Sequence, residues 1–371
     1  MSCKSPLRHV VIGMGAGIME EHLRGLALET AELVAGCDVD EERGRKRADK
    51  LGCAFYADYR AMLAETEPDV AVILTPHPFH APVAIDCLEA GCHVLVEKPM
   101  AVQVAEADAM VEAARRADRL LVVNFQRRYQ ATVRAARRMI QEGRLGEIQH
   151  VAMMAMWTRT AAYYNSGGWR ATWAGEGGGV LLNQAPHDLD MICYLVGKPS
   201  RLFAWTRTLL HPIETEDTVE AMMEWPNGAM GSLHASTAEA GVRQRLEIVG
   251  TRGWLQMTGD AIAFEEAESD IREFIAGCPE RFARPAFCGV PVACSGEEAG
   301  SHADVYRNLH DAILHGAELV VDGAAGLESL ELANAMILSS YTRQEVELPL
   351  DRGQYAELLG RLQAGEPGER R

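Results

Sequence analysis

The sequence predicts an α/β protein in which a doubly wound parallel sheet is followed by an α+β domain with an open-faced, largely antiparallel sheet. From residue 8 to about 124, short Val/Ile/Leu-rich runs alternate with longer amphipathic stretches, the pattern of parallel strands buried on both faces by helices. After Asn124, apolar runs are separated by Gly, Asn and Pro turns, which is typical of successive antiparallel strands. We therefore expect two domains, residues 1–124 and residues 125–371, in keeping with the length of 371 residues.

Six strands are expected in the first domain, each bounded by turn residues or by a helix. They are Arg8 to Gly13, Ala31 to Asp38, Ala54 to Tyr56, Val70 to Thr75, His93 to Glu97 and Leu120 to Asn124. The helices expected between them include Glu41 to Leu51, Tyr59 to Glu65 and Val104 to Ala117, where apolar residues recur at intervals of three and four.

The second domain is expected to begin with a helix from about Gln130 to Glu142. Another helix, from Gln184 to Val196, has Pro186 in its first turn and Gly197 as its stop. Residues 265 to 300 form an irregular excursion to which no role is assigned. The expected strands are Glu147 to Trp157, Arg201 to Leu210, Thr218 to Trp225, Ala229 to Ala238, Gln244 to Gly250 and Trp254 to Thr258, and two closing helices are His302 to His315 and Leu327 to Ser340.

Composition excludes several classes of partner. A formal net charge of −17 repels phosphate backbones and anionic lipid, so neither nucleic acid nor a membrane is an expected partner. No leader-sized apolar segment precedes the first strand, and the nine cysteines include no C-x-x-C pair, so we expect a cytoplasmic protein with reduced thiols. The twelve histidines and nine cysteines show no compact ligand spacing, so no metal is expected.

A glycine-rich turn after the first expected strand predicts a dinucleotide site. Gly13-Met14-Gly15-Ala16-Gly17 opens a helix and can present free N–H groups to a pyrophosphate, although the strict pattern has a third Gly where this chain has Ile18. Asp38 ends the second strand, where a carboxylate accepts hydrogen bonds from both ribose hydroxyls. The same charge repels a 2′-phosphate, and Val39-Asp40 offers no Arg to bind one. The expected cofactor is therefore NAD rather than NADP.

Several further motifs together resemble the Gfo/Idh/MocA family, named for glucose-fructose oxidoreductase and inositol dehydrogenase. The resemblance covers nearly the whole chain and implies a Rossmann domain, an open-faced sheet that often forms the subunit interface, and hydride transfer at a ring secondary alcohol. The motifs are the fingerprint with His22, Thr75-Pro76-His77-Pro78-Phe79-His80, Glu97-Lys98-Pro99, Asn124-Phe125-Gln126-Arg127-Arg128-Tyr129, Trp169-Arg170, the run from Gly177 to Asp190, and Val346-Glu347-Leu348-Pro349.

The resemblance implies roles for residues at matching positions. Thr75, Pro76, His77 and His80 match the segment that lines the cofactor. Glu97 and Lys98 match the motif whose Lys meets nicotinamide and substrate, and Asn124 is expected beside the cofactor. Trp169 and Arg170 resemble the pair that reaches the nicotinamide end. A homodimer or homotetramer through the C-terminal sheet is expected, because its strand-like runs carry more apolar residues than one covered face needs.

One departure bears on the substrate. Inositol-dehydrogenase-like members have Asp four residues before the conserved His, whereas this chain has Asn183 before His187. Asn183-Gln184-Ala185-Pro186-His187 resembles more closely the branch with nucleotide-sugar 3-dehydrogenases and related glycoside oxidoreductases.

Oxidising a secondary alcohol requires one group to accept the hydroxyl proton and others to hold the carbinol oxygen. Lys98 sits at the carboxyl end of a parallel strand, the edge where doubly wound sheets bind ligands. His187 lies in the first turn of a helix, on a face with Asn183 and Asp190. Lys98 and His187 are the expected catalytic pair, and which of them is the primary base stays open.

Substrate contacts are expected from Lys98, Asn183 and His187, and also from Tyr163 and Arg170 in an aromatic stretch suited to polyhydroxylated rings. The sequence favours an NAD-dependent dehydrogenase acting on a sugar, glycoside, nucleotide sugar or cyclitol. Two alternatives stay open: a glycosidase that uses NAD as a transient oxidant, and a catalytically silent nucleotide-binding protein. The substrate, the carbon oxidised, the direction and the oligomer size are not specified by the sequence.

Overall fold

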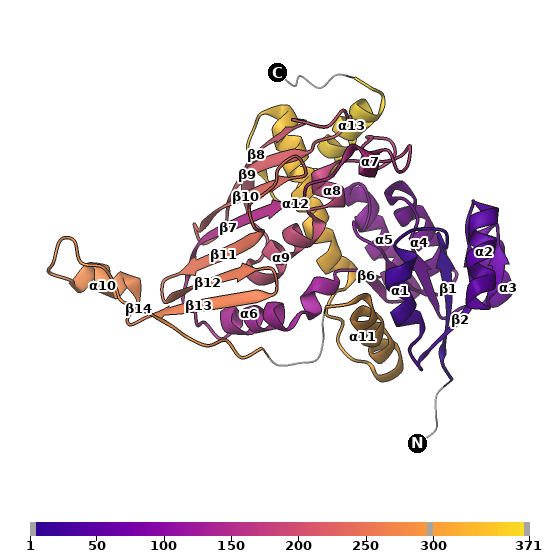
Figure 1. The fold of residues 1–371 in the computed structure, drawn as a ribbon, viewed down its shortest axis with the longest axis horizontal. Helices are drawn as coiled ribbons and strands as arrows, with labels where there is room; N and C mark the ends of the chain where they lie inside the picture. Colours follow the sequence, from indigo (N-terminus) through magenta and orange to yellow (C-terminus); the bar gives the residue numbers. More distant parts are fainter. Residues whose placement is uncertain (1–4, 295–299, 367–371) are drawn as a thin grey trace. The chain divides into compact units, whose positions relative to one another are not determined.

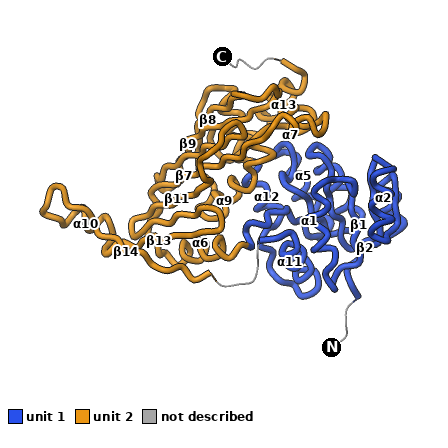
Figure 2. The backbone as a smooth tube through the Cα atoms, in the orientation of Figure 1, with its two compact units in different colours: residues 1–129, 298–330 blue, residues 130–297, 331–371 orange. Residues whose placement is uncertain are grey.

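The chain forms two compact units in the computed structural model, which describes residues 5–294 and 300–366 (Figure 2). Unit 1 comprises residues 1–129 and 298–330, and unit 2 comprises residues 130–297 and 331–371. The division differs from the expected one at residue 124, because helix α11 (His302–His315) packs against α1 (Met19–Leu26) in unit 1. A segment from the C-terminal part of the sequence thus completes unit 1.

Unit 1 is built on a six-stranded parallel sheet, of which β1, β2 and β6 are labelled in Figure 1. The strand order is β3-β2-β1-β4-β5-β6. All six expected strands are present, most of them a residue or two shorter. Because the order reverses between β1 and β4, a crevice for a ligand opens at the carboxyl ends of these two strands. The strands are β1 (Leu7–Ile12), β2 (Ala31–Cys37), β3 (Ala54–Tyr56), β4 (Val70–Ile73), β5 (His93–Val96) and β6 (Leu121–Val123).

Three helices of unit 1 begin where side chains cap them. Asp40 and Asp58 accept hydrogen bonds from the first-turn amides of α2 and α3, and Ser301 and Asp304 form a capping box at the start of α11. Besides α1 and α11, the unit contains α2 (Glu41–Leu51), α3 (Tyr59–Thr66), the 3-10 turn η1 (His77–Phe79), α4 (His80–Glu89), α5 (Val104–Ala117) and the 3-10 turn η2 (Gln126–Tyr129).

Two buried histidines join the start of β1 to α11. His9 and His310 are 0% and 1% exposed, and their Nε2 atoms lie 3.0 Å apart. His9 Nδ1 lies 2.8 Å from the carbonyl oxygen of Leu7, and His310 Nδ1 lies 2.7 Å from the Thr30 hydroxyl. One neutral arrangement satisfies every contact: Thr30 donates to His310, His310 donates through Nε2 to His9, and His9 donates through Nδ1 to Leu7.

Unit 2 is built on a nine-stranded sheet with order β14-β13-β12-β11-β7-β10-β9-β8-β15. Only β7 and β10 pair in parallel; the other neighbours are antiparallel, as expected. Its strands are β7 (Ile148–Met156), β8 (Arg201–Arg207), β9 (Thr218–Glu224), β10 (Met230–Ser236), β11 (Arg245–Gly250), β12 (Gly253–Thr258), β13 (Ala261–Ala267), β14 (Phe287–Gly289) and β15 (Val346–Glu347). Burial alternates along β8 to β12, so the two faces of the sheet differ.

The expected helix from Gln184 begins two residues later in the structure, as α9, because Pro186 suits the first turn of a helix. A separate short helix, α8, ends at Asn183, so Asn183 does not share a helix with His187 as expected. The closing helix α12 begins four residues before the expected Leu327 and crosses from unit 1 into unit 2. The helices are α6 (Ala131–Gln141), α7 (Ala161–Tyr164), α8 (Val180–Asn183), α9 (Pro186–Val196), α12 (Gly323–Thr342) and α13 (Arg352–Gln363).

The excursion expected to be irregular contains two short elements. Helix α10 (Ile271–Gly277) and strand β14 form an extension beyond β13. Ile275 and Phe282 on this extension are 73% and 93% exposed. Residues 295–299 of the excursion lie outside the described part of the chain.

Across residues 5–294 and 300–366, no helix combines the length and apolar character needed to cross a bilayer.

The His9–His310 pair should make unit 1 sensitive to acid. Burial is the main cause that lowers the pKa of His9 to about 3 and of His310 to about 4, below the ordinary 6.5. The unfolded chain therefore takes up these protons first, so stability present above pH 6.5 should fall as the pH drops toward 4. The expected slope approaches ~1.4 kcal/mol per pH unit for each group.

Urea unfolding between pH 7.5 and 4.5 measures this slope. His310→Gln should make it shallower, whereas His315→Gln, at an exposed site on the same helix, should leave it unchanged. Identical slopes for wild type and His310→Gln would contradict this account.

Candidate active site

The glycine turn of unit 1 adopts the close backbone approach that a dinucleotide site needs. Gly13 has φ +91°, and a Cβ atom placed on it would lie 2.8 Å from the carbonyl carbon of Leu74. A side chain would therefore both strain the backbone and collide with the main chain just after β4. The N–H of Gly15 donates to Asp38 Oδ2 at 2.6 Å, so Asp38 also stabilises the turn that precedes α1.

Helix α2 holds the same turn from its other side. Arg47 donates through Nη1 to the carbonyl oxygens of Met14 at 3.3 Å and Ala16 at 2.8 Å. Its second terminal nitrogen lies 3.0 Å from Glu20, in the first turn of α1. Because these carbonyls bind Arg47, the amides of the turn are oriented toward the opposite side.

A pocket of about 490 Å³ lies at the carboxyl ends of β1, β2 and β4. Thr75 lines it, and its Oγ1 has no hydrogen-bond partner in the described part of the chain. An acidic strand end, a tight glycine turn and an apolar wall fit the adenosine half of a dinucleotide. The lining residues are Ile12, Gly13, Ala16, Cys37, Asp38, Val39, Ala57, Asp58, Tyr59, Arg60, Leu74, Thr75, Pro76, Phe79 and Val83.

Five of the expected cofactor residues line this pocket: Gly13, Ala16, Asp38, Thr75 and Pro76. Gly15 and Gly17 belong to the turn, and Ile18, which is 37% exposed, precedes the first residue of α1. Tyr59, Arg60 and Phe79 also line the pocket but were not among the predicted cofactor residues. No motif marks Tyr59 and Arg60, which belong to α3, whereas Phe79 lies within the motif that begins at Thr75.

His80 connects two of the expected motifs. It is 1% exposed, with Nε2 2.7 Å from the carbonyl oxygen of Thr75 and Nδ1 2.8 Å from that of Pro99. Burial lowers the pKa of His80. The neighbouring His77 is also buried, with its ring 5.7 Å from that of His80. Both imidazoles therefore contact the protein's own backbone and rings.

Lys98 follows β5 and is half-buried, and its backbone N–H donates to the Glu97 carboxylate at 3.2 Å. Glu97 itself is 7% exposed and accepts a hydrogen bond from the Asn124 side chain. Glu97 and Asn124, both expected beside the cofactor, thus belong to a buried polar group next to Lys98.

In unit 2, Asn183 lies at the centre of a polar cluster. Its Nδ2 donates to Glu176, and its Oδ1 accepts from the Tyr163 hydroxyl at 3.0 Å and from Gln184 at 2.7 Å. Glu176 is 2% exposed, and its other oxygen accepts the N–H of Ala171 at 2.6 Å. These contacts define which way the Asn183 amide points.

Arg170 is held in the same cluster by two aromatic rings. Its guanidinium carbon lies 4.6 Å from the ring centres of both Tyr163 and Trp169. It donates to the Tyr163 hydroxyl and to Ser166 Oγ, each at 3.0 Å, and lies 3.8 Å from Glu176. The predicted aromatic environment of Arg170 is present.

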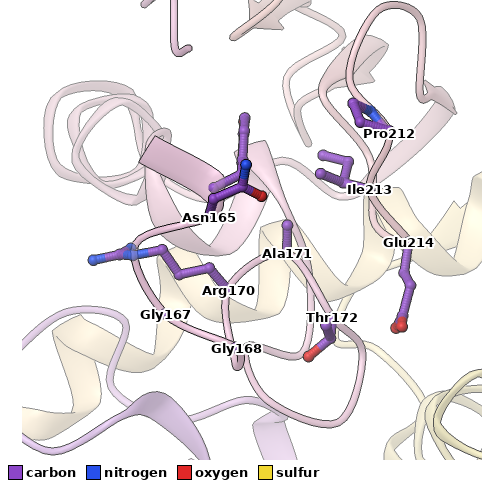
Figure 3. A pocket seen from close by; sticks show the side chains of 10 residues that line it. Asn165, Gly167, Gly168, Arg170, Ala171, Thr172, Pro212, Ile213 and Glu214 are labelled. Atoms are coloured by element: carbon purple, nitrogen blue, oxygen red, sulfur yellow. The ribbon is translucent and has the colours of Figure 1, made fainter. Parts of the chain in front are cut away.

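Beside this cluster, the segment 164–172 and the loop 212–214 enclose a hollow of about 330 Å³ (Figure 3). Arg170, Thr172, Ile213 and Glu214 line it, so charged, hydroxyl and apolar groups face one space. Such a lining suits a ligand with several hydroxyl groups.

His187 is the second residue of α9 and is 9% exposed; Asp190, on the same helix, is 0% exposed. Sequence reasoning found Asn183, Tyr163 and Arg170 but missed Glu176 and Gln184. The sequence does place one carboxylate, Glu176, between Gly175 and Gly177. Because the chain packs closely at Gly175, a charged side chain at this point needs polar partners.

Comparisons with known proteins agree with both units. The family profile described as oxidoreductase family, NAD-binding Rossmann fold, matches residues 7–125, and the GFO/IDH/MocA C-terminal domain matches residues 133–256. D-glucoside 3-dehydrogenase of Escherichia coli is 33% identical over 200 residues, which are 53% of this chain and 56% of that protein.

Two solved structures match nearly the whole chain. The WlbA dehydrogenase of Chromobacterium violaceum, in complex with NADH and UDP-GlcNAcA, has 32% identity and a TM-score of 0.82, covering 94% of this chain and 97% of that one. The Bordetella pertussis WlbA dehydrogenase, also with NADH and UDP-GlcNAcA, has 30% identity and a TM-score of 0.82, covering 94% and 99%. With its NAD-binding Rossmann domain and its matching C-terminal domain, the chain belongs to the GFO/IDH/MocA family of oxidoreductases.

Proposed function

We propose that the protein is an NAD-dependent dehydrogenase that oxidises a ring secondary alcohol of a sugar, glycoside, nucleotide sugar or cyclitol, or reduces the corresponding ketone. The observation that carries the proposal is the placement of Lys98 in unit 1. It follows β5, two strands from β1 in the sheet, and thus lies at the same carboxyl edge as the pocket that fits a dinucleotide.

The chemistry divides between the cofactor and the chain. Bound NAD accepts the hydride from the carbinol carbon, and the hydroxyl proton must leave the oxygen as the C=O bond forms. Lys98 and His187 are the proposed proton-handling pair, with Lys98 also binding the carbinol oxygen. Asn183 has no proton to exchange at neutral pH, so its role is to bind substrate or to support Tyr163.

Unit 2 supports a sugar-like substrate. Tyr163, Arg170 and Asn183 form a preorganised set of hydrogen-bonding groups, and the hollow beside them offers further polar contacts. Both WlbA structures contain a nucleotide sugar, and the E. coli relative is a glucoside dehydrogenase. We therefore favour glycosides and nucleotide sugars over free inositol.

The direct test is an absorbance assay at 340 nm with methyl glucosides, levoglucosan, myo-inositol and UDP-GlcNAcA as candidate substrates. A dehydrogenase forms NADH in proportion to the alcohol consumed. Release of an aglycone without net NADH would instead indicate a glycosidase, and inertness toward the whole panel would favour a nucleotide-binding protein without catalysis.

We also propose a cytoplasmic location. Cys37, Cys87 and Cys92 are free thiols with 3%, 0% and 1% exposure. A reducing compartment keeps thiols free.

Asp38 should determine cofactor preference. Wild-type protein should bind NADH more tightly than NADPH, because the carboxylate bonds the ribose diol and repels a phosphate. Asp38→Ala should weaken NADH binding by roughly tenfold or more, the scale of a lost charged hydrogen bond, and weaken NADPH binding less.

Fluorescence titration with each nucleotide measures the ratio of the two dissociation constants. Asp38 also holds Gly15, so loosening of the turn affects both cofactors and cancels in this ratio. Asp58→Ala, in the same pocket, is the control and should leave the ratio unchanged. Equal or tighter NADPH binding by the wild type would refute the assignment.

Lys98→Met and His187→Ala should each lower kcat by roughly 100-fold, the usual scale for a lost general acid or base, with NADH binding nearly unchanged. Lys50→Met on α2 and His315→Ala on α11 replace exposed residues of the same types and should turn over normally. Normal turnover by either active-site variant would remove that residue from the proton path.

We further propose that the chain forms a dimer or tetramer through the open face of the unit 2 sheet. Trp205, Met222 and Met230 on neighbouring strands are 45%, 59% and 60% exposed, and the ring of Phe203 lies 4.8 Å from that of Trp205. Several large apolar side chains on one sheet face are typical of an interface.

Light scattering at micromolar concentration should therefore give twice or four times the chain mass. Met222→Glu should shift the distribution toward monomer, and Val320→Glu, at an exposed apolar site in unit 1, should not. A monomeric wild type would disprove the interface.

A further inference from the structure

A buried polar cluster in unit 1 surrounds the carboxylate of Glu97, the residue before Lys98. His22 comes from α1, Asn124 follows β6, and His302 is the first residue of α11; the three are 0%, 1% and 8% exposed. Glu97 Oε1 lies 3.0 Å from His22 Nε2 and 3.4 Å from His302 Nε2, and it also accepts a hydrogen bond from Asn124 Nδ2. Three elements distant in sequence thus direct N–H groups at one oxygen.

This arrangement keeps Glu97 ionised. Burial by itself raises the pKa of a carboxyl group, but the hydrogen bonds from His22 and His302 reverse that effect and hold the pKa of Glu97 well below its usual value. Because this pKa lies well below neutrality, Glu97 carries its negative charge at neutral pH.

Tyr306 packs beside His22. Its hydroxyl lies 3.0 Å from His22 Nδ1, so the ring nitrogen that does not face Glu97 also has a polar partner. Tyr306 is 0% exposed and fits because α1 has Gly25 at this point: a Cβ there would lie 2.3 Å from the tyrosine ring. Gly25, Tyr306 and His22 thus form one packed unit behind Glu97.

The other carboxylate oxygen connects the cluster to Lys98. Glu97 Oε2 accepts the backbone N–H of Lys98 at 3.2 Å. A carboxylate held on one side by His22 and His302 therefore restrains, on its other side, the main chain from which the Lys98 side chain extends. Small displacements of a reacting group reduce rates strongly, so such a restraint has a catalytic consequence.

We propose that His22 and His302 are positioning residues for the reaction: acting through Glu97, they fix the main chain at Lys98 and so place its amine. The proposal rests on the function proposed for Lys98. It assigns a role in the reaction to α11, a helix more than two hundred residues away in the sequence.

His22, Glu97 and His302 are of the residue types that bind zinc. Their ligand atoms lie within 4.8 Å of one another, and across residues 5–294 and 300–366 no other group of three such residues has this spacing. One contact favours the hydrogen-bonded cluster: Asn124 directs an amide N–H, which is not a metal ligand, at the shared oxygen.

The experiment compares variants by amide hydrogen exchange and by kinetics. His302→Leu should speed exchange of the Lys98 amide by roughly tenfold or more and lower kcat by a similar factor, with NADH affinity within about twofold of wild type. The kinetic probe is the alcohol of the substrate panel that the wild type oxidises fastest. His302→Gln, which keeps a side-chain N–H, should recover part of both losses.

His310→Leu is the matched control, because His310 is also buried on the same helix but bonds His9 and Thr30 rather than Glu97. It should lower stability without changing Lys98 exchange or kcat. Tyr306→Phe removes a single hydroxyl and serves if His302→Leu does not fold; it should change exchange and kcat in the same direction but less.

Four outcomes would overturn the proposal: unchanged exchange at Lys98, faster exchange with normal kcat, equal effects in His310→Leu, or one bound zinc per chain in metal analysis of purified protein. Failure of the proposed function is distinguishable, because the wild type would then form no NADH with the substrate panel, or Lys98→Met would turn over normally, whatever the exchange rates show.

Discussion

The approach of Gly13 to the main chain of Leu74 is the constraint on which the nucleotide site depends. With 2.8 Å between an added Cβ and the Leu74 carbonyl carbon, β1 can turn beside β4 only if the turn residue has no side chain. That contact places the turn at the point where the strand order reverses. The Gly15 amide then reaches Asp38, and Arg47 binds the carbonyls behind the turn. The positions of Asp38, of the glycine turn and of the pocket thus follow from the close contact between Gly13 and Leu74.

Much of the fold follows from local pattern. The six strands of unit 1 were recognisable because strands buried on both faces are continuous apolar runs. The strands of unit 2 were recognisable because turn residues separate successive apolar runs. Local pattern does not show against which other elements a segment packs. His302 to His315 was expected as a helix, but its packing on α1 depends on the contacts of Tyr306 with Gly25 and His22, which no sequence spacing reveals.

The candidate site shows the same division. Asp38, Lys98, Asn183 and His187 were predicted because motifs mark them. Glu176 and Gln184 were missed because their importance comes from a hydrogen-bond network, and a network is visible only when its members are adjacent in space. The amide of Asn183 illustrates the difference: its residue type excludes proton transfer, but only its contacts with Glu176 and Tyr163 show how it is oriented.

The return of residues 298–330 to unit 1 has a consequence for how the protein comes into being. Contacts such as His9 with His310 and His22 with Tyr306 join positions separated by 301 and 284 residues. Closing loops of that length is entropically costly and slow. During synthesis, an emerging nucleotide-binding half would lack α11 and would expose the buried faces of His9, His22 and Glu97 until nearly the whole chain had left the ribosome. The N-terminal half is therefore not an independently transferable module: a fragment ending near residue 129 would have the glycine turn and Asp38, but not the helix that closes the surface behind them.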